Sequence, residues 1–121
     1  MERDELGRWG EGVAAMALQA RGYKVLCRNF RGSRGGEVDL VCRHGQVLVF
    51  AEVKTRASGK HGRPSDAVTR SKQHLVRRGA KEWLSRLSVS EVPCRFDVVE
   101  VVVESGVRPR VNVIAGAFGD A

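Results

Sequence analysis

The feature that most constrains this fold is a pair of apolar runs, residues 38–42 and 47–53, separated by four turn-forming residues. Both runs are rich in β-branched side chains, and residues 43–46 between them (Arg-His-Gly-Gln) have the composition of a tight turn. This pattern predicts an antiparallel β-hairpin with His44 and Gly45 as its two-residue loop.

The two faces of this hairpin are expected to differ in chemistry, because side chains alternate between the faces of a strand. In this register Asp39 faces Phe50 and Glu37 faces Glu52. One face is wholly apolar and consists of Val38, Leu40, Cys42, Val47, Val49, Ala51 and Val53. The other is apolar near the turn and charged at its far end, and consists of Glu37, Asp39, Val41, Leu48, Phe50, Glu52 and Lys54. A three-residue turn would exchange the two faces.

The charged end of the second face has the composition of a cation site. The carboxylates of Asp39, Glu52 and Glu37 are expected to lie close together at this end. Because the sheet is expected to be covered on both sides, these like charges would destabilise one another. Lys54 compensates one charge, and a hard divalent cation beside a phosphodiester would compensate the others. Glu37 has a second interpretation, in which it lies in the preceding loop and holds Arg31 or Arg34.

Positive charge is concentrated in the part of the chain that follows these acids. The 121 residues have a formal net charge of +7. Residues 54–81 contain nine Lys or Arg and one acid, whereas the rest of the chain has twelve basic and thirteen acidic residues. Such a concentration is typical of a surface that binds a polyanion, and nucleic acid in particular. The alternative is a solvated surface that only keeps the protein in solution.

The remaining composition argues against a secreted, membrane-bound or zinc-binding protein. The first five residues are mostly charged, so no signal peptide is expected, and no apolar stretch approaches transmembrane length. Cys27, Cys42 and Cys94 are scattered and odd in number, which favours buried thiols in a reducing compartment over disulfides or zinc ligands. The three histidines lack ligand spacing. The expected location is the cytoplasm.

Residues 4–20 are predicted to form a helix that ends before Gly22. Its main apolar stripe consists of Leu6, Trp9, Val13, Met16, Ala17 and Ala20. Glu11 lies off that stripe, in line with the small side chains of Ala14 and Ala15. Small residues on that side favour close packing, so Glu11 either points toward the sheet or is an ordinary exposed helix glutamate.

The rest of the pattern predicts a single mixed α/β or α+β domain over residues 1–121. Asp97 lies in an apolar strand and is interpreted as a structural hydrogen-bonding residue, and Trp9 and Trp83 as core residues. The further expected elements are strands at 23–30, 95–104 and 111–114, a helix from Ser65 or Asp66 to about Leu87, flexible segments at 32–36 and 57–64, and a loose tail at about 116–121.

Several of these segments resemble the PD-(D/E)xK nuclease superfamily, which has the restriction-endonuclease-like fold. They are Glu11, residues 36–41 (Gly-Glu-Val-Asp-Leu-Val), residues 50–56 (Phe-Ala-Glu-Val-Lys-Thr-Arg) and the helix that follows. More narrowly, the chain resembles the small bacterial YraN family of uncharacterised proteins, and it is similar in outline to archaeal Holliday-junction resolvases. The likeness covers most of the chain. Val38 stands where the motif has its proline, a position that varies in the superfamily.

The resemblance implies a central mixed five-stranded sheet flanked by two main helices. It implies Asp39 and Glu52 as ligands of Mg²⁺ or Mn²⁺, the Val53 carbonyl as a further ligand, and Glu11 reaching the ion directly or through water. Lys54 would lie beside the attacking water. The expected nucleic-acid contacts are Arg56, Lys60, Arg63, Arg70, Lys72, Gln73 and Arg77.

The resulting hypothesis is a metal-dependent DNA endonuclease that hydrolyses phosphodiester bonds and is selective for branched or damaged DNA. Two alternatives stay open: a non-catalytic nucleic-acid-binding module with the same fold, and a nuclease subunit that cuts only together with a partner. The sequence does not decide between DNA and RNA, between one and two metal ions, or between a monomer and a homodimer.

Overall fold

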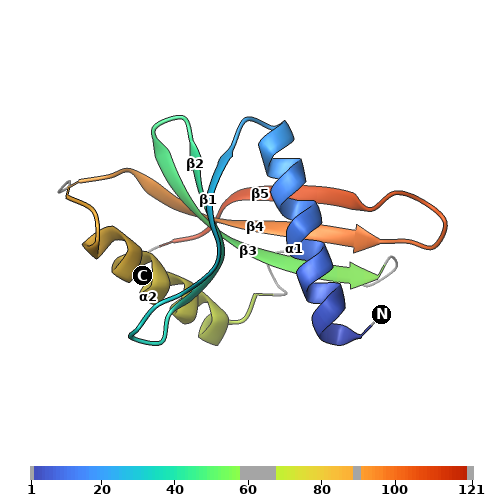
Figure 1. The fold of residues 1–121 in the computed structure, drawn as a ribbon, viewed down its shortest axis with the longest axis horizontal. Coiled ribbons are helices and arrows are strands. Elements are labelled where there is room, and N and C mark those ends of the chain that lie inside the picture. Colours follow the sequence, from blue (N-terminus) through green and yellow to red (C-terminus); the bar gives the residue numbers. More distant parts are fainter. Residues whose placement is uncertain (1, 58–67, 89–90, 120–121) are drawn as a thin grey trace.

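The computed structural model describes residues 2–57, 68–88 and 91–119. They form two helices and five strands in the order α1 (Arg3–Ala20), β1 (Lys24–Arg31), β2 (Glu37–His44), β3 (Val47–Ala57), α2 (Arg70–Ser85), β4 (Cys94–Val103) and β5 (Arg110–Phe118) (Figure 1). The strands make one sheet in the order β1-β2-β3-β4-β5. Only β3 and β4 are parallel, and α2 joins them, so the predicted mixed α/β sheet with two helices is confirmed.

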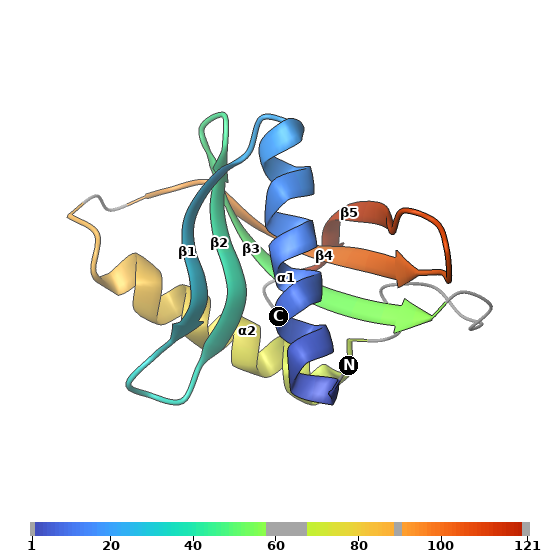
Figure 2. The same ribbon diagram turned by 45° about the vertical axis from the view of Figure 1, so that its right-hand side comes forward.

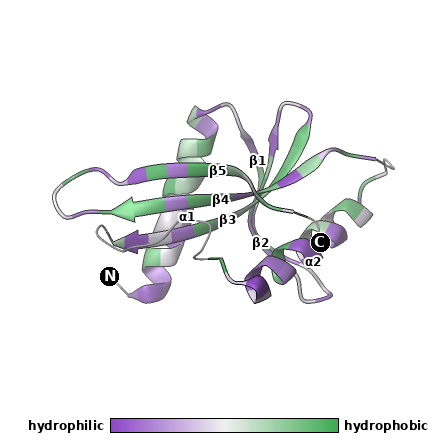
Figure 3. Ribbon diagram, turned by 180° about the vertical axis from the view of Figure 1, so that it is seen from behind, coloured by the Kyte–Doolittle hydropathy of each residue, from purple (hydrophilic) through white to green (hydrophobic). Residues whose placement is uncertain are grey.

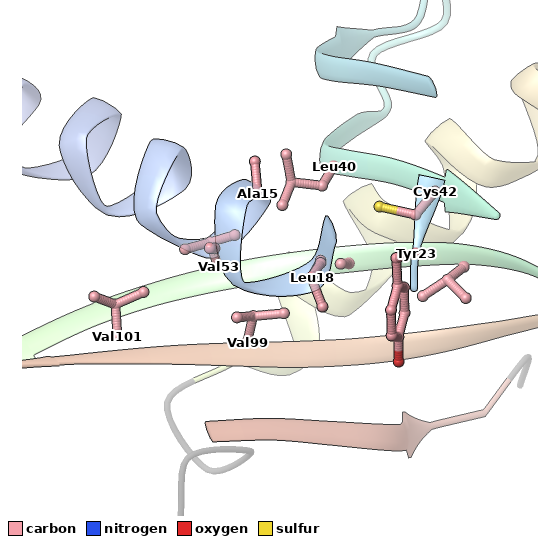
Figure 4. Close-up of a cluster of buried hydrophobic side chains, with 11 residues drawn as sticks. Ala15, Leu18, Tyr23, Leu40, Cys42, Val53, Val99 and Val101 are labelled. Atoms are coloured by element: carbon pink, nitrogen blue, oxygen red, sulfur yellow. The ribbon is translucent and has the colours of Figure 1, made fainter. Parts of the chain in front are cut away.

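The two helices cover opposite faces of the sheet (Figures 1 and 2). On one face, Ala14, Ala15 and Leu18 of α1 pack on buried side chains of β2, β3 and β4 (Figure 4). On the other face, Val76 and Ala80 of α2 pack on an aromatic cluster that includes Phe30, Phe50 and Phe96. Hydrophilic residues are frequent along α2, where they alternate with hydrophobic ones, and at the N-terminal end of α1 (Figure 3). Each strand of the central hairpin therefore contributes to two cores.

The buried side of α1 is not the predicted apolar stripe. Met16, in the middle of that stripe, is 71% exposed, and Ala20 is exposed as well. The buried residues are Gly10, Ala14, Ala15 and Leu18, on the side that carries Glu11. The prediction was wrong because it weighted large apolar side chains, whereas a helix that lies close to a sheet needs small ones at the contact. Trp9 remains partly buried at the margin of this core, as does Trp83 in the other.

The central hairpin is present, but its register differs from the predicted one by two residues. His44 pairs with Val47, and the loop consists of Gly45 and Gln46. Gly45 has a φ of 63°, which suits the first position of the type II′ turn that matches the twist of the strands. Phe50 therefore faces Val41, and the predicted pair of Asp39 with Phe50 was wrong.

A shift of two residues preserves the faces of both strands, since side chains alternate with a period of two. Leu40, Cys42, Val49, Ala51 and Val53 share one apolar face, as predicted, and this face belongs to the core under α1. The exception is Val38, which packs in the cluster under α2.

The glycine-rich connection between β1 and β2 is held against α2, so the prediction of a flexible segment was wrong. Glu82 of α2 accepts hydrogen bonds from the backbone N–H groups of Ser33 (2.8 Å) and Arg34 (3.0 Å). Gly36 lies against the backbone of Gly79, and a Cβ atom on Gly36 would overlap that backbone. The two glycines thus allow the hairpin and the helix to approach more closely than side chains would permit.

Two further boundaries differ from the sequence-based expectation. The second helix begins at Arg70, with Thr69 as its N-cap, whose side chain accepts a hydrogen bond from the Lys72 N–H. The last strand extends to Phe118, which stacks on Phe96. Residues 116–118 therefore belong to the sheet and not to a loose tail.

The buried polar groups away from the charged end of the hairpin have structural partners. Asp97 accepts hydrogen bonds from the Tyr23 hydroxyl, the Arg95 guanidinium and the Gly116 N–H, which confirms its structural role. The thiol of Cys42 is buried, and this burial raises its pKa to about 12, so it behaves as a small apolar residue. Neither helix of the described ranges has the length and apolarity needed to cross a bilayer.

Candidate metal centre between two forked strands

The candidate site lies where β2 and β3 separate. The two strands are paired only from Leu40 and Ala51 to the turn, although β2 begins at Glu37 and β3 continues to Ala57. Beyond this point β2 stays with β1, whereas β3 stays with β4, so the sheet opens into a fork (Figures 1 and 2). Backbone groups at the base of the fork lose their partners in the neighbouring strand, and they need other ones.

Asp39 supplies one of these partners. Its Oδ2 accepts a hydrogen bond of 2.8 Å from the Val53 N–H, across the opening of the fork. This bond fixes one oxygen of the carboxylate and sets the side chain beside Glu52, the residue before Val53. The two acids that the sequence analysis combined into a cation site are therefore neighbours, on adjacent strands, at the place where the sheet opens.

Glu52 is the more unusual of the two acids because it is buried. Its side chain is 3% exposed, and Oε1 has no hydrogen-bond partner within the described part of the chain. Burial, the negative charge of Asp39 and a hydrogen bond to that carboxylate raise the pKa of Glu52 to about 8. At neutral pH the pair Asp39–Glu52 therefore holds a proton that a divalent cation could replace.

Two lysines lie around Glu52 from different elements. Lys54 follows it on the same face of β3, with Nζ 3.8 Å from Oε2, and its side chain is 36% exposed. Lys72 of α2 reaches the same oxygen at 3.9 Å and Glu37 at 3.2 Å. Although burial opposes the charge on Lys72, the carboxylates around it prevail and raise its pKa.

Glu37 acts as a link between cationic side chains. It binds Arg31 at 2.6 Å and Lys72 at 3.2 Å, and the hydrogen bond from Lys72 is the main cause of its lowered pKa. Of the two interpretations of Glu37, the pairing with Arg31 is confirmed, although Glu37 is the first residue of β2 and not part of the loop.

Glu11 approaches the same centre from α1. Its Oε1 is buried without a hydrogen-bond partner among the described residues, and burial together with the charge of Asp39 raises its pKa. Asn29, whose side chain hydrogen-bonds to Glu11, has a φ of 53° and is the only non-glycine residue with positive φ in the described ranges. Asparagine is among the few residues that adopt this conformation readily.

These side chains match the donor set of a hard divalent cation. Two buried carboxylate oxygens, Glu11 Oε1 and Glu52 Oε1, have no hydrogen-bond partner among the described residues, and the charge of Asp39 acts on both groups. Oxygen ligands of this kind suit Mg²⁺ or Mn²⁺. In the ranges that the structure describes, no three His, Cys, Asp or Glu side chains are already arranged as a chelating group. The structure thus brings together a pair of acids, Asp39 and Glu52, with Glu11 as a nearby third.

Most of the described residues that were predicted to contact nucleic acid have partners within the chain. Arg56 forms an ion pair with the buried Glu100. Lys72 belongs to the carboxylate cluster, and Gln73 donates a hydrogen bond to the Val68 carbonyl. Arg70 is exposed on the first turn of α2, and Arg77 donates to the carbonyl of Gly119. Lys60 and Arg63 lie outside the described residues, and the nucleic-acid contacts stay predictions.

Two features of the centre escaped sequence reasoning. Asn29 gave a weak signal, since asparagine tolerates positive φ, but nothing near it indicated a contact with Glu11. The partnership of Lys72 with Glu37 and Glu52 depends on how α2 packs across the sheet, which local sequence does not encode. The resemblance to resolvases implied a polar residue of this helix near the site, but it did not indicate the ion pairs of Lys72 with Glu37 and Glu52.

Comparison with known proteins identifies the family of this chain. The model of "Uncharacterised protein family UPF0102" matches residues 10–101, which include Glu11, Asp39 and Glu52. A UPF0102 protein of Symbiobacterium thermophilum is 47% identical over 113 residues, covering 93% of this chain and 95% of the relative. A UPF0102 protein of Geobacter sulfurreducens is 45% identical over 113 residues, covering 93% and 88%. The chain therefore belongs to the uncharacterised family UPF0102, in agreement with its resemblance to YraN proteins.

Proposed function

We propose that this protein is a divalent-cation-dependent nuclease that hydrolyses phosphodiester bonds within DNA strands. The observation that carries the proposal is the buried Glu52 carboxyl, which lies beside Asp39 at the fork and whose Oε1 has no hydrogen-bond partner in the ranges that the structure describes. A carboxylate pair buried in this way is costly unless a proton or a cation accompanies it. Perturbed acids in such a place are typical of catalytic sites.

The role proposed for each side chain follows from the contacts that hold it. Asp39 is oriented by the Val53 N–H before any ligand arrives, which favours a fixed coordination geometry. Glu52 would give up its proton as the cation binds, and Glu11 would supply a further oxygen from α1. A cation held by these oxygens would neutralise charge on the phosphate and activate a water molecule.

Lys54 has the position expected of a group that interacts with the phosphate. Its ammonium is within 4 Å of Glu52 and yet partly exposed, so it can contact a ligand at the surface of the fork. Lys72 is engaged with Glu37 and Glu52, so its contribution is to limit the repulsion among the acids. The positive charge of residues 54–81 would favour the approach of DNA.

A second function is favoured by two ion pairs of Glu52. Both Lys54 and Lys72 form ion pairs with Glu52, so the acids are partly compensated by the chain itself. A nucleic-acid-binding module with this fold would therefore not need a cation. Binding of Mn²⁺ or Mg²⁺, measured by calorimetry with the wild-type protein and with Asp39→Asn, separates the two functions.

The test of the nuclease is a cleavage panel of duplex, single-stranded, flap and four-way-junction DNA with Mg²⁺ or Mn²⁺. We expect cutting by the wild-type protein and a loss of at least about 100-fold in Asp39→Asn and in Glu52→Gln, because each variant removes an anionic ligand. DNA binding should persist in both variants. The panel also tests the proposed preference for branched DNA.

The matched control is Asp97→Asn, which alters a buried carboxylate that has only structural partners. It should lower thermal stability while leaving cation binding intact at a temperature where the protein is folded. Cleavage that persists in Asp39→Asn would identify a contaminating nuclease. A wild-type protein that binds neither cation at pH 8 would contradict the proposal.

A further inference from the structure

A second cationic surface adjoins the carboxylates at the N-terminal end of α1, the helix that covers the face of the sheet opposite to α2. It is a groove of about 540 Å³ between the first turns of α1 and the end of β1. Its lining consists of Arg3, Asp4, Gly7, Arg8, Glu11, Asn29 and Arg31. Three guanidinium groups thus surround an opening that ends at Glu11, one of the proposed cation ligands.

The guanidinium groups of this groove are available to a ligand. Arg3 and Arg8 are exposed and have no hydrogen-bond or ion-pair partner in the part of the chain that the structure describes. The Arg31 side chain is 70% exposed, although it binds Glu37. Since guanidinium groups match the geometry of phosphate oxygens, these arginines are suited to a phosphate backbone.

The groove is connected to the carboxylate centre by direct contacts. Glu11 and Asn29 belong to both. Along the other wall, Arg31 binds Glu37, Glu37 binds Lys72, and Lys72 reaches Glu52, at 2.6, 3.2 and 3.9 Å. A strand that places one phosphate at Asp39 and Glu52 would therefore place its neighbouring phosphates in the groove.

From these contacts we infer that the groove of Arg3, Arg8 and Arg31 binds the phosphates on one side of the bond that is attacked. This inference rests on the proposed function and refines it. With the exposed Arg70 at the N-terminal end of α2, which covers the opposite face of the sheet, the site would hold a strand that continues in both directions. The substrate class is then an internal position of a DNA strand and not a free end or a mononucleotide.

The test uses the full chain with Asp39→Asn, which prevents cutting, and a labelled four-way junction as the probe, with a duplex alongside. Arg3→Ala/Arg8→Ala removes two proposed phosphate contacts. The matched control, Lys24→Ala/Arg43→Ala, removes two exposed positive charges. These residues lie opposite each other on β1 and β2, at the far end of the sheet. Affinity is measured by fluorescence anisotropy at several salt concentrations.

We expect the groove variant to lower the slope of log K against log salt by about 2, since each lost phosphate contact contributes about 0.9. The control should change it by less than half of that. Arg3→Lys/Arg8→Lys should recover most of the affinity, which excludes misfolding as the cause. Ethylation interference should identify phosphates on one flank whose modification weakens binding, and this interference should disappear only in the groove variant.

An equal decrease of the salt slope in the groove variant and in the control would overturn the inference without contradicting the proposed nuclease function. If Asp39→Asn without further changes does not bind the junction or the duplex, the inference and the proposed function both fail. If the wild-type protein cuts DNA only at strand ends, the nuclease activity stands and the internal substrate class is wrong.

Discussion

At the scale of single residues, the protonation state of Glu52 determines the charge of the carboxylate centre. Its pKa is raised to about 8 by burial and by Asp39, so the folded protein retains a proton that the unfolded chain releases near pH 4.5. In the absence of divalent cations, Glu52 therefore contributes most stability below pH 4.5, and this contribution is lost as the pH rises to 8.

Substitution of Glu52 by glutamine should remove this dependence. We expect urea denaturation in EDTA to show that the wild-type protein loses stability between pH 5 and 8, with an upper bound of about 5 kcal/mol. Glu52→Gln should change much less over this range and be the more stable protein at pH 8. A wild-type protein whose stability rises from pH 5 to 8 to the same extent as that of the variant would show that Glu52 is ionised in the folded state.

At the scale of helices and strands, the position of Glu11 depends on how α1 packs on β3. Gly10 is buried against Thr55, and a Cβ atom at residue 10 would overlap the Thr55 hydroxyl. The absence of a side chain at this position lets α1 lie close to the sheet, one residue before Glu11. The same glycine explains why small residues, and not the large apolar stripe, face the sheet.

Replacement of this glycine tests the close approach. We expect Gly10→Ala to destabilise the fold by about 1–3 kcal/mol through overpacking, despite the better helix propensity of alanine. Gly7→Ala, in the same helix with open space around it, should be neutral or stabilise by up to about 1 kcal/mol. Thermal denaturation of both variants measures the difference.

Removal of the opposing side chain provides the decisive control. Thr55→Ala in the Gly10→Ala background should recover part of the lost stability, so the double-mutant cycle should have a favourable coupling energy. If the two substitutions are additive, α1 and β3 are not in direct contact at this position.

At the scale of the whole molecule, cation binding at the proposed centre would be coupled to folding, because the proposed ligands come from α1, β2 and β3. A cation that binds only the folded chain stabilises it by about 2.7 kcal/mol at a concentration 100 times its Kd. We expect Mg²⁺ or Mn²⁺ to raise the melting temperature at pH 8 and to have a much smaller effect at pH 6, where the proton on Glu52 competes. The effect should be absent in Asp39→Asn, and an equal shift in this variant would place the ion elsewhere.

The sequence was sufficient for the parts of this molecule that depend on local pattern. The alternation of side chains predicted the faces of the hairpin. The predicted proximity of Asp39 and Glu52 is correct despite the error in register, because a shift of two residues leaves both side chains on the same face. Turn geometry decided the register itself, since the first loop position needs a positive φ, which Gly45 adopts readily, whereas a loop of His44 and Gly45 would require it of His44.

The parts that could not be predicted depend on contacts between distant segments. The anchoring of the glycine-rich loop depends on Glu82, which lies about fifty residues away in the chain. The groove of Arg3, Arg8 and Arg31 lies in the part of the chain where basic and acidic residues nearly balance, so charge counting did not indicate it. Only the crossing of α1 and β1 brings these arginines together.

The fork between β2 and β3 makes one backbone amide a reporter of the site. Asp39 Oδ2 accepts the Val53 N–H because β2 is no longer a ladder partner there. Any ligand that withdraws electron density from this carboxylate must weaken that bond. The nitrogen-15 resonance of Val53 should therefore move on titration with a diamagnetic ion such as Mg²⁺, and solvent should exchange its amide deuterium more quickly. This gives a readout of occupancy that needs no substrate and no turnover.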